Sequence, residues 1–357
     1  MYTVLNKKEL QRYPEFDNHF MVVKLFEPKV CLDGYISIHR QRQGYPALGA
    51  TRMWSYSSEE DALRDSLRLA RLMSYKSVLA GLPYTGAKAA LIFSPNSQIN
   101  RRDFFKAYAS VVNELGGQFV TGTDVGVNNT DLAVMAAESK FMIGNGVDSG
   151  FYTAVGILDS ILESLREVFN SEDLSARSFA IQGLGKTGGH LLKLLVKGGA
   201  NNIFVTDINP RKTWYYKLRY PFIKLVNPVA IYTREADVFC PCALSHAVTA
   251  ERIPFFKFKI IAGSANNQLE SVQAGQDLFD KGILYAPDYV INAGGLVSVT
   301  DEMENGKSDH ERTLSKIKKI RDSLSAIYFS SKQEGQSTNI VADNLAEEIL
   351  ARNCAVK

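Results

Sequence analysis

One stretch of the sequence constrains the fold more than any other. It reads SFAIQGLGKTGGHLLKLLVKGGANNIFVTDIN and covers residues 178–209. An apolar segment, a glycine-rich turn, an amphipathic helix pattern and a second apolar segment follow one another, which is the order of a βαβ unit. Such units have a right-handed crossover between parallel strands. The sequence therefore predicts an α/β fold with a doubly wound, Rossmann-like sheet.

The glycines of this unit are spaced G-x-G-x-x-G, at Gly183, Gly185 and Gly188. Between a strand and a helix, three such glycines make a tight turn, let the backbone approach a pyrophosphate and allow close contact of helix and sheet. The helix begins at Lys186 and Thr187, and its N-terminus would face the phosphates. This segment therefore predicts a dinucleotide site.

Asp207 ends the second strand of the unit, 22 residues after Gly185. An acid at this place meets the ribose hydroxyls of NAD and would repel the 2′-phosphate of NADP. Arg211 and Lys212 lie nearby and leave some room for use of both cofactors. NAD is the predicted cofactor.

Length and composition narrow the class of protein. A chain of 357 residues predicts two domains, and 45% hydrophobic residues with a net charge of +3 argue against disorder and against a polybasic nucleic-acid scaffold. No window suits a signal peptide or a membrane span, and the four cysteines form no CxxC pair, so we expect a cytoplasmic protein with reduced thiols. The five histidines lack the spacing of metal ligands, and no metal is predicted.

The pattern changes near residues 145–150, where we place a domain boundary. Before it, the periodicity predicts a mixed α/β unit with helices over 58–76 and 101–117 and strands over 35–39, 89–94 and 118–122. After it, we expect a helix over 151–169, the βαβ unit, further strands over 237–242, 259–264 and 283–290, and last helices over 311–334 and 340–353.

Two lysines stand out by their surroundings. Lys76 ends an amphipathic helix, and Lys88 lies between a Pro/Gly turn and an apolar strand. Burial and a nearby second cation both lower the pKa of a lysine, which allows it to act as a neutral base. Asp124, in TGTDVG at the end of another strand, is the matching acid. Taken singly, each of these residues could be a solvated surface charge, and for a lone lysine that interpretation is favoured because lysines are rarely buried.

Several longer motifs occur in one order: LPYTGAK, TGTDVG, the nucleotide segment, CPCALSHAV, IAGSANNQL and APDYVINAGGL. Over about residues 30–350 the sequence resembles the NAD-dependent amino-acid dehydrogenases, most closely the leucine and phenylalanine dehydrogenases. The resemblance implies a substrate domain over 1–147, a Rossmann-like NAD-binding domain over 148–329 and a C-terminal segment, 330–357, that returns to the first domain. It also implies catalysis in the cleft between the domains, and a homo-oligomer.

The resemblance assigns roles around the substrate. Lys76 matches the lysine that grips the substrate carboxylate, Lys88 matches the catalytic lysine, and Asp124 matches the acid that shares its proton chemistry. Asn266 matches an asparagine that contacts substrate, and Asn292 is expected to line the same cleft. The implied reaction passes a hydride from the amino acid to NAD, after which water activated by Lys88 releases ammonia and a 2-oxo acid; the reverse is reductive amination.

Four further positions match residues near the cofactor. Thr153 corresponds to a threonine beside the nicotinamide, and Arg52 to an arginine of the cleft. Cys242 and Ala243, in CPCALSHAV, are expected at a strand end beside the cofactor.

Three features depart from the family pattern. Ala87 and Ala50 stand where the family has glycines, and the segment 144–153 is several residues shorter. These changes permit a second interpretation, a catalytically reduced NAD-binding paralogue that acts in an assembly. Retention of both lysines and of the acid favours the enzyme.

The substrate class follows from the segment YPALGA. Related glutamate dehydrogenases carry a lysine where this chain has Leu48, followed by Gly49, and Leu296 and Val299 add apolar surface to the same pocket. A side-chain carboxylate buried without a cation is strongly disfavoured. We therefore expect an apolar amino acid, with leucine, isoleucine and valine first and phenylalanine or tryptophan as the alternative.

Overall fold

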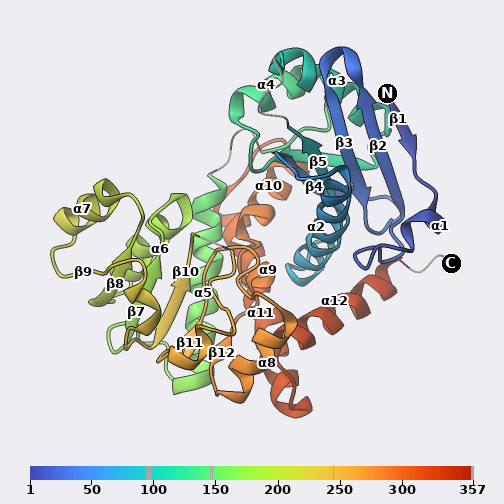
Figure 1. The fold of residues 1–357 in the computed structure, drawn as a ribbon. Coiled ribbons are helices and arrows are strands. Elements are labelled where there is room, and N and C mark those ends of the chain that lie inside the picture. Colours follow the sequence, from blue (N-terminus) through green and yellow to red (C-terminus); the bar gives the residue numbers. More distant parts are fainter. Residues whose placement is uncertain (94–98, 145, 147, 244, 355–357) are drawn as a thin grey trace.

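The computed structural model describes residues 1–93, 99–144, 146, 148–243 and 245–354. Its two sheets lie in separate halves of the molecule (Figure 1). The first sheet has the order β1-β2-β3-β5-β4-β6. Its strands are β1 (Tyr2–Val4), β2 (Met21–Glu27), β3 (Leu32–Ile38), β4 (Ala47–Trp54), β5 (Thr85–Ile92) and β6 (Phe119–Thr123).

The first sheet is mixed. Strands β4, β5 and β6 are parallel, while β1, β2 and β3 pair in antiparallel fashion and β3 joins β5. Its helices are α1 (Lys7–Leu10), α2 (Glu59–Leu79), α3 (Arg101–Glu114) and α4 (Asn129–Glu138), with a 3₁₀ turn η1 (Pro28–Val30). The mixed α/β unit predicted from the sequence is therefore present, with β1, β2 and β4 as additional strands.

Helix α2 forms because its sequence supplies a cap and an apolar face. The hydroxyl of Ser58 accepts the backbone N–H of Asp61 at 3.1 Å, and acidic residues fill the first turn. Leu63, Leu67 and Ala70 are buried against the sheet. Since this packing fixes the helix along β5, it also fixes Lys76 in the last turn.

The second sheet has the order β12-β11-β10-β7-β8-β9, and all its described pairs are parallel. Its strands are β7 (Ser178–Gln182), β8 (Asn202–Thr206), β9 (Lys224–Leu225), β10 (Val238–Pro241), β11 (Ile260–Ile261) and β12 (Leu284–Tyr285). This is the strand order of a doubly wound dinucleotide-binding fold, and the order reverses between β7 and β10. The predicted Rossmann-like sheet is confirmed.

Helices cover the second sheet and connect it to the first unit. They are α5 (Ser149–Phe169), α6 (Lys186–Lys197), α7 (Pro210–Arg219), α8 (Val272–Asp280), α9 (Asp288–Ile291), α10 (Gly294–Asn305), α11 (His310–Glu334) and α12 (Thr338–Cys354), with the 3₁₀ turns η2 (Ala230–Thr233) and η3 (Ile253–Phe255). Helix α12 packs against α2 (Figure 1). The C-terminal helices thus return to the first unit, as predicted.

Two boundaries differ from the sequence pattern. The apolar run over 283–290 is a strand only at Leu284–Tyr285, because Pro287 and Asp288 then begin α9, where proline and an acid both favour a helix start. The division placed at residue 329/330 falls inside α11, which is one continuous helix. The division at 147/148 lies between α4 and α5.

The structure adds two findings about surfaces and thiols. None of the helices in the described part of the chain is long and apolar enough to cross a membrane. The four cysteines are all free thiols.

Candidate active site

A cavity of about 370 Å³ lies between the two units. The first unit contributes residues of β4, α2 and the segment after β6, and the second contributes residues of α5, α10 and the loop after β11. The lining residues are Gly49, Ala50, Met73, Lys76, Gly122, Thr123, Ile143, Gly144, Ser149, Thr153, Thr187, Ser264, Asn266, Asn292, Gly295, Leu296 and Val299. Eight of the residues predicted from the sequence are among them.

Lys76 is the only charged side chain among the described residues that line this cavity. Burial lowers its pKa to about 8; the charge of Asp288 opposes this shift, and the charge of Lys88 adds to it. An ammonium group in such a cavity attracts a carboxylate strongly, because water screens the pair poorly.

Lys88 lies on the face of β5 that α2 covers. Its neighbour two residues earlier, Gly86, donates its backbone N–H to the hydroxyl of Ser74 in α2 at 2.7 Å, and alternate residues of a strand share a face. The Lys88 ammonium contacts Asp124 Oδ2 at 2.5 Å, and only 6% of its side chain is exposed. Burial lowers the pKa of Lys88, although Asp124 opposes this.

Asp124 binds a second cation. Its Oδ2 also accepts a hydrogen bond from Arg52 Nε at 3.1 Å. Burial alone would raise the pKa of Asp124, but the charges of Lys88 and Arg52 outweigh it and hold this pKa well below its usual value. The acid is therefore ionised at neutral pH, and it can accept a proton only when Lys88 has changed its own charge.

Arg52 is held in turn by Asp65 of α2. Its Nη1 lies 3.0 Å from Asp65 Oδ2, which also accepts the hydroxyl of Tyr56 at 2.8 Å, while Asp65 Oδ1 accepts Arg68 at 2.8 Å. The resemblance placed Arg52 near the cofactor. In the structure its guanidinium bridges two carboxylates, those of Asp124 and Asp65.

Two predicted asparagines contact each other on the second unit's side of the cleft. Asn292 Nδ2 donates to Asn266 Oδ1 at 2.8 Å and to the carbonyl of Ser264 at 3.3 Å. Asn292 Oδ1 is buried and has no hydrogen-bond partner within the described residues. A buried amide oxygen without a donor is costly, so it is suited to receive an N–H or O–H from a bound molecule.

Thr153 joins α5 to α10. Its hydroxyl donates to the carbonyl of Ser149 at 2.8 Å and accepts the backbone N–H of Gly295 at 3.1 Å. A side chain at Gly295 would meet this hydroxyl at 2.7 Å, so the close approach of the two helices needs the glycine. Leu296 and Val299, which follow on α10, thereby face the cavity.

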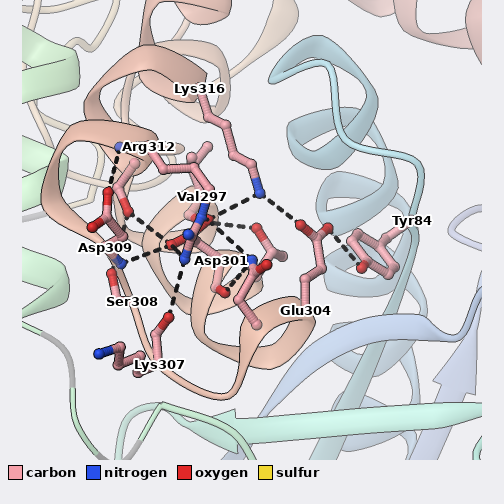
Figure 2. A network of polar contacts seen from close by, with 12 residues as sticks. Tyr84, Val297, Asp301, Glu304, Lys307, Ser308, Asp309, Arg312 and Lys316 are labelled. Carbon is pink, nitrogen blue, oxygen red and sulfur yellow. Dashed lines mark hydrogen bonds and ion pairs between the residues drawn. The ribbon is translucent and has the colours of Figure 1, made fainter.

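A polar network fixes the far end of α10 (Figure 2). Asp301 accepts Arg312 Nε at 2.5 Å, Lys316 at 3.1 Å and the backbone N–H of Asp309 at 3.0 Å. Glu304 accepts Lys316 at 2.6 Å and the hydroxyl of Tyr84, from the loop before β5, at 2.9 Å. The network therefore connects the helix that carries Leu296 to the strand that carries Lys88.

The glycine-rich loop follows β7 and lies at the point where the strand order reverses. Gly183 has φ +94°, a conformation that disfavours other residues. A side chain at Gly188 would meet the Gly183 carbonyl at 2.0 Å, whereas the space beside Gly185 is open. This geometry suits a turn, a tight helix contact and room for a pyrophosphate.

Asp207 is held against this loop. Its Oδ2 accepts the backbone N–H of Leu184 at 2.8 Å, and its Oδ1 accepts that of Asn209 at 2.8 Å. The ammonium of Lys212 lies 4.0 Å from Oδ2. The carboxylate is therefore oriented beside the glycine turn, with one exposed cation next to it.

The other predicted cofactor residues surround the same turn. Cys242 donates its backbone N–H to Gln182 at 2.7 Å, and a side chain at Gly183 would meet Ala243 at 2.6 Å. Lys186 lies 3.4 Å from Asp148 Oδ1. These contacts bring the ends of β7 and β10 together, which is where ligands bind in open parallel sheets.

Ala87, Ala50 and Leu48 lie in different surroundings. Ala87 is fully buried in the core between the first sheet and α3, with Phe104 and Phe119, so its methyl points away from the face of Lys88. Ala50 does line the cavity. Leu48 is 1% exposed and packs in the core beside Tyr84 and Val120, instead of on the cavity surface. In the shortened segment 144–153, residues 145 and 147 lie outside the described residues.

Sequence reasoning missed several lining residues. Met73 precedes Lys76 by three positions and so shares its side of α2, a signal that was available. Ile143 and Ser264 lie in loops and Thr123 ends β6, and these three could be identified only from the folded chain.

Comparison with known proteins places this geometry in context. Residues 23–141 match the family model described as Glu/Leu/Phe/Val dehydrogenase, dimerisation domain, and residues 216–351 match that described as Glutamate/Leucine/Phenylalanine/Valine dehydrogenase. A phenylalanine dehydrogenase of Bacillus thermotolerans is 39% identical over 94% of this chain and 89% of its own length. A leucine dehydrogenase of Geobacillus stearothermophilus is 37% identical over 95% and 93%.

A solved structure is similar as well. The L-tryptophan dehydrogenase of Nostoc punctiforme matches 94% of this chain and 96% of its own, with a TM-score of 0.83 and 36% sequence identity. The relatives are thus named for different apolar amino acids at nearly equal identity, so their names leave the side-chain preference of this chain open.

Proposed function

This chain belongs to the Glu/Leu/Phe/Val dehydrogenase family and is an amino-acid dehydrogenase, and on that premise we propose that it deaminates an apolar L-amino acid with NAD. Leucine, isoleucine and valine are the favoured substrates, and phenylalanine or tryptophan the alternative. The products are a 2-oxo acid and ammonia, and the reverse reaction is reductive amination.

One observation carries the substrate class. Lys76 is the single cation on the described lining of the cleft, and the remaining side chains there are small, polar without charge, or apolar. One carboxylate is therefore balanced, and a second one, as in glutamate, would be buried without a partner. Met73, Ile143, Leu296 and Val299 supply apolar surface for the substrate side chain.

The residues present divide the work of the reaction. Lys76 binds the substrate carboxylate, and Asn266 and Asn292 orient the groups around the α-carbon. NAD, when bound, supplies the acceptor for the hydride of that carbon. Lys88, whose lowered pKa makes a neutral amine accessible, takes a proton from the water that attacks the resulting iminium carbon. Asp124 holds Lys88 in place and stabilises its charged form after this transfer.

The dinucleotide site fits NAD by its own geometry. The open space at Gly185 leaves room for the pyrophosphate at the N-terminus of α6. Asp207 is fixed beside the turn and can accept ribose hydroxyls with its remaining lone pairs. A 2′-phosphate would meet this carboxylate, with Lys212 as the only cation within 4.0 Å of it among the described residues.

The substrate proposal is tested by a series of kcat/KM values for aliphatic, aromatic and acidic amino acids. We expect leucine, isoleucine or valine to lead and glutamate to be slower by orders of magnitude. Equal activity on glutamate and leucine would refute the single-cation argument. The same series is measured in Leu48→Lys, with Leu48→Met as the matched control. It tests whether a cation at this position confers activity on glutamate.

The cofactor proposal is tested by kcat/KM for NAD and NADP in the wild type and in Asp207→Ala. The wild type should have the higher kcat/KM with NAD. In Asp207→Ala the ratio of the two kcat/KM values should be smaller, because the carboxylate that repels the 2′-phosphate is absent. Equal values in the wild type would overturn the assignment.

We also propose a homo-oligomer, supported by the match of residues 23–141 to a dimerisation domain. Light scattering coupled to size-exclusion chromatography tests this, and a monomeric mass at micromolar concentration would contradict it.

A further inference from the structure

Asp288 is a buried carboxylate that the mechanism above does not use. It is the first residue of α9 and is 6% exposed. Its Oδ2 accepts the backbone N–H of Gln268 at 2.8 Å, and its Oδ1 accepts that of Tyr289 at 2.7 Å. Both oxygens therefore meet donors, and a proton on either one would point at an N–H group. Burial raises the pKa of Asp288, whereas these two hydrogen bonds and the charge of Lys76 oppose that shift and favour the ionised form.

The bond to Gln268 fixes the loop that carries Asn266. Gln268 is fully buried, and its Nε2 donates to the carbonyls of Gly263 at 2.7 Å and Ala265 at 3.0 Å. The loop is thus closed on itself by Gln268 and anchored to α9 by Asp288. Asn266 lies within this closed segment and lines the cleft.

Asn292 depends on the same residue from the other side. Its backbone N–H donates to the carbonyl of Asp288 at 2.9 Å, while its side chain donates to Asn266 at 2.8 Å. The side chain of Asp288 therefore anchors one asparagine of the cleft, and its main chain anchors the other.

Asp288 also faces Lys76. Helix α9 packs on α2, and the rings of Tyr289 and Tyr75, the residues next to Asp288 and Lys76, lie 6.3 Å apart between centroids. Within the described residues no ion pair joins Asp288 to Lys76 at 4.0 Å or less. Its charge acts on Lys76 without a direct ion-pair contact.

The other groups that surround these two residues are few. Lys76 faces Asp288 from α9, Lys88 from β5 and Asp124 from the segment after β6. Asp288 faces Lys76, Tyr285 and Tyr289. Lys88 and Asp124 pair with each other, so Asp288 is the one carboxylate near Lys76 that has no cation of its own in contact.

We propose that Asp288 is a positioning residue with two tasks, to anchor the Asn266 loop through Gln268 and to keep Lys76 a cation for the substrate carboxylate. This inference rests on the proposed function, because it assumes that Lys76 binds that carboxylate. It assigns the acid of APDYVINAGGL to the substrate side of the cleft, without contact to the substrate itself.

The test is the dissociation constant of a branched 2-oxo acid, measured with NADH and without ammonium, so that no turnover occurs. In the wild type, affinity should fall as pH passes the pKa of Lys76, about 8. In Asp288→Asn the loss of the opposing charge lowers the pKa of Lys76, so the fall should begin about one pH unit lower, with affinity near pH 8 reduced up to about tenfold.

Two further variants separate the tasks. Asp343→Asn is the matched control, since Asp343 is a partly buried acid that accepts the hydroxyl of Tyr289, but it is not among the charges that face Lys76. Its pH profile should equal that of the wild type. Asp288→Glu keeps the charge but moves the carboxylate away from the backbone N–H of Gln268, so it should weaken binding at every pH without moving the onset.

Several results would overturn the inference. An unshifted onset in Asp288→Asn, or an equal shift in Asp343→Asn, would remove the electrostatic task. Unchanged affinity in Asp288→Glu would remove the anchoring task. If Asp288→Asn fails to fold, Asp288→Glu still tests the inference: the charge is retained, so the onset should match the wild type while affinity falls. A wild type that binds no 2-oxo acid would refute the proposed function instead.

Discussion

Two clusters of charged side chains in this molecule both combine aspartate with lysine and arginine. They differ in whether the buried partner is the cation or the anion. In the cleft, the buried partner is a cation, Lys88, and its carboxylate partner Asp124 is 22% exposed at the side chain. At the junction of α10 and α11 the buried partner is the anion, Asp301, and its cations Arg312 and Lys316 extend toward solvent.

The difference decides what each cluster can do. Burial lowers the pKa of Lys88 and prepares it to exchange a proton. At the junction, Glu304 and Asp301 outweigh burial and raise the pKa of Lys316, and the cations hold the pKa of Asp301 far below its usual value. The first cluster is suited to proton transfer, and the second holds its charges fixed over the working pH range.

The largest expected effect separates the two lysines by activity. Lys88→Ala should reduce kcat by about 10² to 10⁴, the contribution of general acid–base catalysis, with NAD affinity unchanged because the nucleotide lies on the other unit. Lys316→Ala is the control and should keep kcat near the wild-type value. Steady-state kinetics and a fluorescence titration with NADH measure both. If Lys88→Ala kept more than a tenth of the wild-type kcat, Lys88 would not be the base.

Next in size is a difference in stability between the two acids. Asp301→Asn should lower the free energy of unfolding by about 1–3 kcal/mol, because it leaves the donors of a buried site without acceptors. Asp124→Asn should cost less, since Lys88 can release its proton and Arg52 keeps its bond to Asp65, whereas the arginine at the junction can do neither. Urea unfolding at pH 7 compares them. The reverse order would contradict the distinction drawn above.

The contribution of Asp301 also depends on pH with a defined sign. Its folded pKa is depressed, so its stabilisation is complete above the unfolded pKa of about 3.9 and is lost progressively as the pH falls from there through the lower, folded pKa. The unfolding free energies of the wild type and of Asp301→Asn should therefore begin to approach each other below about pH 4 and should still differ at pH 3. Parallel curves down to that pH would contradict the assignment.

The smallest expected effect concerns the link between the clusters. Tyr84→Phe removes one hydroxyl from Glu304, which keeps its bond to Lys316, so the loss of unfolding free energy should be about 0.5–1.5 kcal/mol. A double-mutant cycle with Glu304→Gln measures the coupling of the pair. A coupling energy of zero would show that the hydroxyl contributes nothing across the cleft.

The sequence allowed the two lysines, the acid and the nucleotide turn to be predicted, because each lies at a local signal such as a helix end, a strand end or a glycine spacing. The partners of Arg52 could not be predicted in the same way. Asp65 and Asp124 are 13 and 72 residues from it, and β4, which carries it, lies between β5 and β6 although it precedes both in the chain. Ala87 could be predicted only in part. Alternation along β5 places its methyl on the face opposite Lys88, but only the folded strand shows which of the two faces points to the core.

The position of α12 has a consequence for how the chain is made. This last helix packs on α2, whose final turn carries Lys76. During synthesis the second sheet and its helices leave the ribosome as one contiguous stretch and can close their core early, whereas α2 waits for residues 338–354. Until then the apolar side of α2 that α12 will cover is exposed. The half of the molecule made first is therefore the half completed last, and a chain that stops before residue 338 would lack a finished substrate unit while retaining all the strands of both sheets.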